Sequence, residues 1–101
     1  MSAVLPALSR EYLRVDVEAE GVPLEVLLTL GVSFAFMSTK DARPASGDWK
    51  TGDWEPGAAT ARVLMGPGGA ATLTAAQYYA WLRIDGAVER PVRPVGIVKV
   101  I

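Results

Sequence analysis

The chain contains neither cysteine nor histidine in its 101 residues. Without them, Ser-His and Cys-His nucleophilic arrangements are excluded, and so are zinc sites built from thiolate or imidazole ligands. The lack of cysteine also means that no disulfide stabilises the fold, and that the sequence does not indicate whether the protein works in an oxidising or a reducing compartment. Stability must therefore come from packing.

Long hydrophobic runs and an excess of charge are also missing. The longest nearly uncharged run, 26–37, is about half of the ~20 residues that a membrane helix needs, and Gly31 and Ser33 interrupt it. Residues 1–10 have no basic residue before their apolar part, unlike a secretory signal, so a cytoplasmic origin is the default. Ten Lys and Arg residues against eleven Asp and Glu residues give a net charge of −1. We therefore expect neither a nucleic acid nor a membrane as partner.

What the chain does have is apolar residues in an alternating order. Half of the residues are hydrophobic, which is enough for the core of one domain. Period-two alternation between apolar and polar side chains predicts strands with one buried face. It is clearest in 13–20, 32–37, 58–65 and 78–85, and a final strand is expected at 95–101.

Turn residues separate these segments. Gly66-Pro67-Gly68-Gly69 predicts a tight turn, since it lacks the Lys-Ser/Thr ending of a phosphate-binding loop. Asp85-Gly86 is a hairpin signal, and a short strand is expected at 71–74. The apolar segment 24–30 fits either a strand or a single helical turn. Roughly six to eight strands at a spacing of about ten residues indicate a small sandwich or barrel.

The tripeptide Gly-Asp-Trp occurs twice, at 47–49 and 52–54. Because the spacing is odd, a regular strand would place Trp49 and Trp54 on opposite faces, unless a bulge or turn at Gly52 brings them to one side. We expect a short hairpin or a bulged edge here. Exposed indoles in such a loop could contact a protein partner or stack on a sugar.

Carboxylates crowd the same segment. Asp48, Asp53 and Glu55 could form a glycosidase-type pair or hold calcium. Their Gly-rich surroundings favour solvated turn carboxylates instead, and no EF-hand or nonapeptide spacing is present. We therefore expect no enzyme activity, no catalytic residue, no cofactor and no metal site.

A basic, proline-containing stretch, Arg90-Pro91-Val92-Arg93-Pro94, precedes the last strand. Its PxxP spacing resembles a polyproline ligand, but inside a folded domain proline more often marks an edge or a strand start. Arg90 and Arg93 are then available to a neighbouring protein. With Trp49 and Trp54 they form our set of candidate partner-contact residues.

The order of these features resembles a known group. The chain is similar to small virion-associated β-sandwich proteins of tailed phages that infect actinobacteria, encoded among head and connector genes, and more loosely to the Ig-like N-terminal domain of phage baseplate upper proteins. The resemblance covers most of the chain and is carried by 12–18, Phe34 and Phe36, Gly47-Asp48-Trp49-Lys50, Trp54-Glu55, 61–69, 73–84, Pro91-Val92-Arg93 and Gly96.

The resemblance implies a non-enzymatic structural protein of the virion. Such a protein would decorate the head or sit at the head-to-tail connector, in many copies or as a homo-oligomer, in contact with capsid, connector or tail proteins. The alternative that we keep is a carbohydrate-binding module that uses Trp49 and Trp54. We predict one antiparallel β-sandwich, Ig-like in general architecture, at 12–101, preceded by an N-terminal arm at 1–11.

Overall fold

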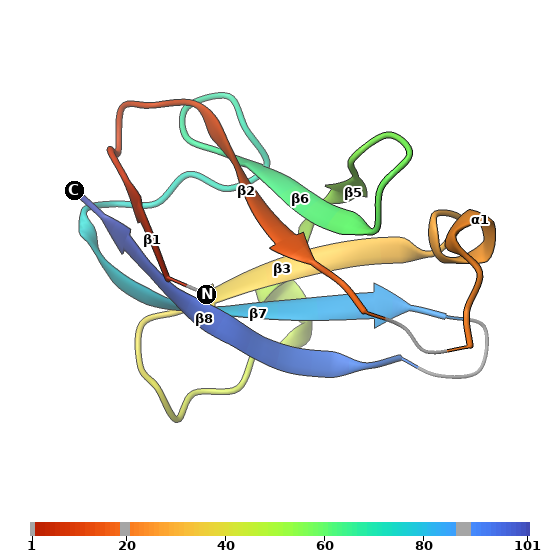
Figure 1. The fold of residues 1–101 in the computed structure, drawn as a ribbon. Helices are drawn as coiled ribbons and strands as arrows, with labels where there is room; N and C mark the ends of the chain where they lie inside the picture. Colours follow the sequence, from red (N-terminus) through yellow and green to blue (C-terminus); the bar gives the residue numbers. More distant parts are fainter. Residues whose placement is uncertain (1, 19–20, 87–89) are drawn as a thin grey trace.

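The computed structural model describes residues 2–18, 21–86 and 90–101, and these residues form two facing β-sheets (Figure 1). The elements in chain order are β1 (Ser2–Leu5), β2 (Glu11–Asp16), α1 (Leu24–Leu27), β3 (Gly31–Met37), the 3₁₀ turn η1 (Ser46–Asp48), β4 (Lys50–Thr51), β5 (Asp53–Trp54), β6 (Thr60–Met65), β7 (Ala76–Asp85) and β8 (Val92–Val100). The predicted fold class, a small β-sandwich, is confirmed.

The larger sheet has the strand order β1-β8-β7-β3-β4, and the smaller sheet has the order β2-β6-β5. Apart from β1, the strands divide between the sheets as strands G, F, C, C′ and B, E, D divide in an immunoglobulin sandwich. Neighbouring strands are antiparallel, except that β1 runs parallel to β8, with Ser2 opposite Ile97 and Leu5 opposite Val100.

The core lies between the sheets and follows the alternation in the sequence. Along β6, Ala61, Val63 and Met65 are buried while the residues between them are partly exposed. Phe34 and Val98 of the facing sheet are fully buried. Period-two side chains thus supply both inner faces, as expected for strands with one wet face.

Residues 2–11, treated on sequence grounds as an arm, lie against the sandwich. Ser2–Leu5 form the edge strand β1, and the N–H of Ile101 donates to the carbonyl of Leu5 at 2.9 Å. The N–H of Ala7 donates to the carbonyl of Ile101 at 2.7 Å, and Ala3, Leu5 and Ala7 pack on the core.

The expected hairpin at Gly52 is not formed, because the chain changes sheets there. β4 pairs with β3 in the larger sheet, and β5 pairs with β6 in the smaller one. A Cβ on Gly52 would lie 2.5 Å from the carbonyl oxygen of Arg62 and 2.9 Å from the ring of Phe34. The absence of a side chain therefore lets the chain pass between the two sheets.

The structure decides between the two alternatives for 24–30 and shortens the strand expected at 71–74. The segment 24–30 begins with one helical turn, α1, which follows Pro23, a residue suited to the start of a helix. The strand expected at 71–74 is only a single bridge between Ala71 and Met65. Met1, Ala19, Glu20 and residues 87–89, which follow the expected hairpin signal Asp85-Gly86, lie outside the described residues.

Candidate functional site

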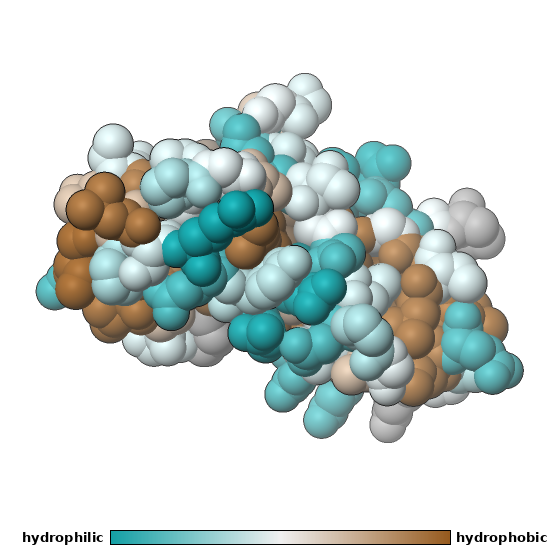
Figure 2. Space-filling model, turned by 90° about the horizontal axis from the view of Figure 1, so that it is seen from above, coloured by the Kyte–Doolittle hydropathy of each residue, from teal (hydrophilic) through white to brown (hydrophobic). Residues whose placement is uncertain are grey.

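The outer face of the three-stranded sheet is polar, and its charged groups pair with one another. Arg14 Nε donates to Glu55 Oε1 at 2.9 Å, and Arg62 makes two hydrogen bonds to Asp53 at 2.9 and 3.1 Å. The guanidinium carbons of Arg14 and Arg62 lie 5.4 and 4.3 Å from the ring centroid of Tyr12. Figure 2 shows this face as mostly hydrophilic between two apolar ends.

The hydrogen bonds from Arg62 to Asp53 raise the pKa of the Arg62 guanidinium above its ordinary value. Like any arginine, Arg62 is charged throughout the neutral range. The charged side chains of this face are thus already paired with one another.

The three candidate carboxylates serve separate local roles. Asp48 accepts a hydrogen bond from the N–H of Ala45 at 2.8 Å, while Asp53 and Glu55 are held by Arg62 and Arg14. In the described part of the chain, no three metal-ligating side chains gather into a group that could hold a metal ion.

The outer face of the five-stranded sheet has a different chemistry. On β7, Ala80 and Leu82 point into the core, so the alternating residues Tyr79, Trp81, Arg83 and Asp85 point outward. Their direct neighbours form cross-strand rows: Met37, Tyr79 and Ile97; Ala35, Trp81 and Pro94; Ser33, Arg83 and Val92. We call these nine residues with Trp49 the outer aromatic face.

Large side chains cover the middle of this face. Ala35 is fully buried although it points away from the core cluster, and Ser33 is only 7% exposed. The guanidinium carbon of Arg83 lies 4.7 Å from the ring centroid of Trp49, a cation–π contact. Two tryptophans, one tyrosine and one arginine thus form an aromatic layer where a solvent-facing sheet normally carries polar residues.

This layer contains polar atoms that the fold leaves unsatisfied. Among the described residues, the buried side-chain atoms without a hydrogen-bond partner are Trp81 Nε1, Arg83 Nε and Asp85 Oδ1. All three belong to the outward positions of β7. Arg83 Nε and Arg90 Nε lie 3.3 and 2.9 Å from Asp85 Oδ1, as ion pairs without hydrogen-bond geometry.

The four residues chosen from the sequence are not brought together. Trp49 belongs to the outer aromatic face, and Arg90 pairs with Asp85, which points outward at the end of β7. Arg93 is exposed on β8, opposite the inward-pointing Leu82. Trp54 lies in the other sheet, packs against the core, and donates from Nε1 to the carbonyl of Leu30 at 2.8 Å. The two indoles therefore do not form a joint sugar-binding platform.

Tyr79, Trp81 and Arg83 are not among the candidate residues chosen from the sequence. The signal was present in the alternation of 78–85, which placed them on the outer side of a strand. The candidate residues were chosen instead for an expected position in a loop, as for Trp49 and Trp54.

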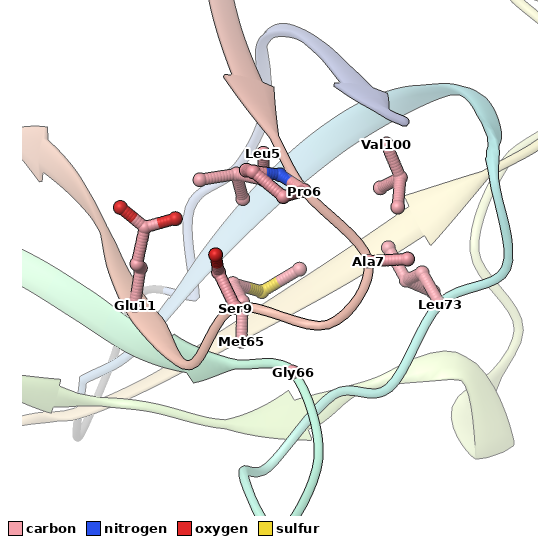
Figure 3. Close-up of a pocket in the computed structure, with 9 residues that line it drawn as sticks. All are labelled: Leu5, Pro6, Ala7, Ser9, Glu11, Met65, Gly66, Leu73 and Val100. Atoms are coloured by element: carbon pink, nitrogen blue, oxygen red, sulfur yellow. The ribbon is translucent and has the colours of Figure 1, made fainter.

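An apolar depression lies at one end of the sandwich, between the β1–β2 segment and the turn after β6 (Figure 3). Leu5, Ala7, Met65, Leu73 and Val100 supply most of its apolar wall. The space inside is about enough for one water molecule, so the depression is too small for an organic ligand.

No helix in the described ranges is long and apolar enough to cross a membrane. Comparisons with protein-family models, curated proteins and solved structures gave no match to the chain.

Proposed function

We propose that the chain is a non-enzymatic assembly domain of a tailed-phage virion, and that it binds a capsid, connector or tail protein through the outer aromatic face. The observation that carries the proposal is the contrast between the two outer faces. One has its charges compensated internally, whereas the other presents Trp81, Tyr79 and Ile97 in adjacent rows.

Aromatic side chains suit a protein interface. Contiguous apolar patches on a surface are typical of interaction sites, and Trp, Tyr and Arg are enriched among the residues that dominate binding energy. Trp81 and Tyr79 lie at the centre of the face, with Trp49 and Arg83 beside them. The position of the face on a central strand also holds these side chains on a rigid platform.

The virion as the setting comes from the sequence resemblance. A small domain without disulfides, present in many copies on a particle, gains affinity from repeated contacts even when each contact is weak. The free edges of the two sheets offer further places where neighbouring subunits could pair.

The experiment uses particles of the phage that encodes the chain, purified by density gradient and analysed by quantitative mass spectrometry. Trp81→Ala should lower the amount of the chain per particle at least tenfold, because a central interface Trp contributes ~2 kcal/mol or more. Arg14→Gln, on the opposite face, is the matched control and should leave incorporation unchanged.

Thermal unfolding and circular dichroism are measured for both variants to check that they are folded. Wild-type chain absent from particles would rule out the virion assignment. Full incorporation of Trp81→Ala would rule out this face as the interface.

A further inference from the structure

The charges that border the outer aromatic face are mostly positive. On and beside β7 and β8, the outward residues and their ion-pair partners include Arg83, Arg90 and Lys99 as cations and Asp85 as an anion, so three cations face one anion there. Lys99 points outward because it lies opposite Gln77, whose side-chain amide donates to the Tyr79 hydroxyl at 3.2 Å. The whole chain, in contrast, has a net charge of −1.

The polar atoms left unsatisfied on the face point to the same chemistry. Trp81 Nε1 and Arg83 Nε are both donors, so each needs an acceptor oxygen. A buried donor without an acceptor is costly, and a partner that supplies a carboxylate or carbonyl oxygen would remove this cost. Asp85 holds the two guanidinium groups only with poor geometry, so an incoming carboxylate can take its place.

The rest of the face is aliphatic. Ala35 and Pro94 flank Trp81, and Met37 and Ile97 flank Tyr79. The Trp49 ring is already in contact with Arg83. Aliphatic side chains pack well on such a surface, whereas stacked nucleobases need exposed ring faces.

We infer that the partner seated on the outer aromatic face is an acidic protein segment, with apolar side chains against Trp81 and Tyr79 and a carboxylate at Arg83 and Arg90. The charge complementarity and the two unsatisfied donors carry this inference. It rests on the proposed function, since it specifies the partner of the same surface. Because Trp81 Nε1 is covered in the structure, the inference requires the Trp81 side chain to change rotamer on binding, as side chains at interfaces commonly do.

The test probes the folded full chain with an array of ten-residue peptides in matched triplets. Each triplet keeps the same leucines and phenylalanines and places Asp/Glu, Asn/Gln or Lys/Arg at the remaining positions. Fluorescence anisotropy then gives the Kd of the best acidic peptide and of its amide counterpart. We expect the acidic peptide to bind at least tenfold more tightly in 50 mM NaCl, and this advantage to shrink in 500 mM NaCl because salt screens the charges.

Variants locate the binding. Arg83→Gln and Trp81→Ala should each weaken the acidic peptide about tenfold or more, and Arg14→Gln on the opposite face should not change it. The inference is overturned if no peptide binds, if amide or basic peptides bind as well as acidic ones, or if a fifteen-residue oligo-dT competes for the site. It is also overturned if the chain dimerises through this face, seen as dissociation by Trp81→Ala in light scattering.

The two proposals fail separately. If particles lose the Trp81→Ala chain but the array shows no acidic preference, only the acidic partner is wrong. If particles retain the Trp81→Ala chain, the proposed function itself is wrong.

Discussion

At the scale of single residues, Gly52 determines how the two sheets are connected. It lies between β4 and β5, and its N–H donates to the carbonyl of Val32 at 2.9 Å. There is no room for a Cβ, since the nearest atoms are the Arg62 carbonyl oxygen and the Phe34 ring. Backbone on one side and the core on the other hold this position, so neither neighbour can move without cost.

Gly52→Ala should therefore destabilise the fold by about 1–3 kcal/mol, the usual cost of overpacking a close-packed site. Urea unfolding followed by tryptophan fluorescence measures the change. Gly47→Ala is the control, because a Cβ at Gly47 meets nothing within 4 Å, and it should alter stability by less than ~0.5 kcal/mol. Equal stability of the two variants would show that the sheet crossing tolerates a side chain.

Trp54 and Trp49 belong to the same sequence repeat but have different roles. The Trp54 indole donates to the Leu30 carbonyl at the end of the α1 segment, whereas the Trp49 ring lies under Arg83. Trp54→Phe should cost about 1–2 kcal/mol, because it leaves a partly buried carbonyl without its donor. Trp49→Phe keeps a ring under the guanidinium and should cost less than ~0.5 kcal/mol. The midpoint of guanidinium unfolding compares them, and the reverse order would contradict these assignments.

At the scale of elements, strands with clear alternation were predictable. The pattern of 78–85 predicted both faces of β7, and the alternation of 58–65 predicted the strand β6, in which Ala61, Val63 and Met65 are buried. These predictions succeed because period-two burial is a local property of an extended chain. The tight turn predicted at 66–69 also depends on local sequence. Its Gly66 and Gly68 have positive φ values of 102° and 78°, which glycine adopts readily.

Elements that depend on distant contacts were not predictable. β4 and β5 have two residues each, too few to show a period, and their assignment to different sheets depends on the fit of Gly52 against Arg62 and Phe34. The pattern placed Trp81 on the outer side of its strand. It did not reveal that this outer side has no covering sheet in the described residues, so the choice of candidate site went to loop positions instead.

At the scale of the whole molecule, the pairing of β1 with β8 joins the two ends of the chain. Ser2 lies opposite Ile97, 95 positions later, and Leu5 lies opposite Val100. Of the strand pairings in the sandwich, this one closes the longest stretch of chain, so it has the largest entropic cost of loop closure. We therefore expect β1 to dock late, after β7 and β8 have formed their hairpin.

Leu5→Ala tests this order of events, because Leu5 packs against the core from β1. If β1 docks after the transition state, the loss of stability appears in the unfolding rate, which should rise about tenfold for a loss of ~1.4 kcal/mol, while the folding rate stays the same. Stopped-flow fluorescence across a denaturant series gives both rates. Leu82→Ala, in the β7–β8 hairpin, is the contrast and should slow folding. A Leu5→Ala chain that folds more slowly, with unchanged unfolding, would place the joining of the chain ends before the transition state, and β1 would then be part of the folding nucleus.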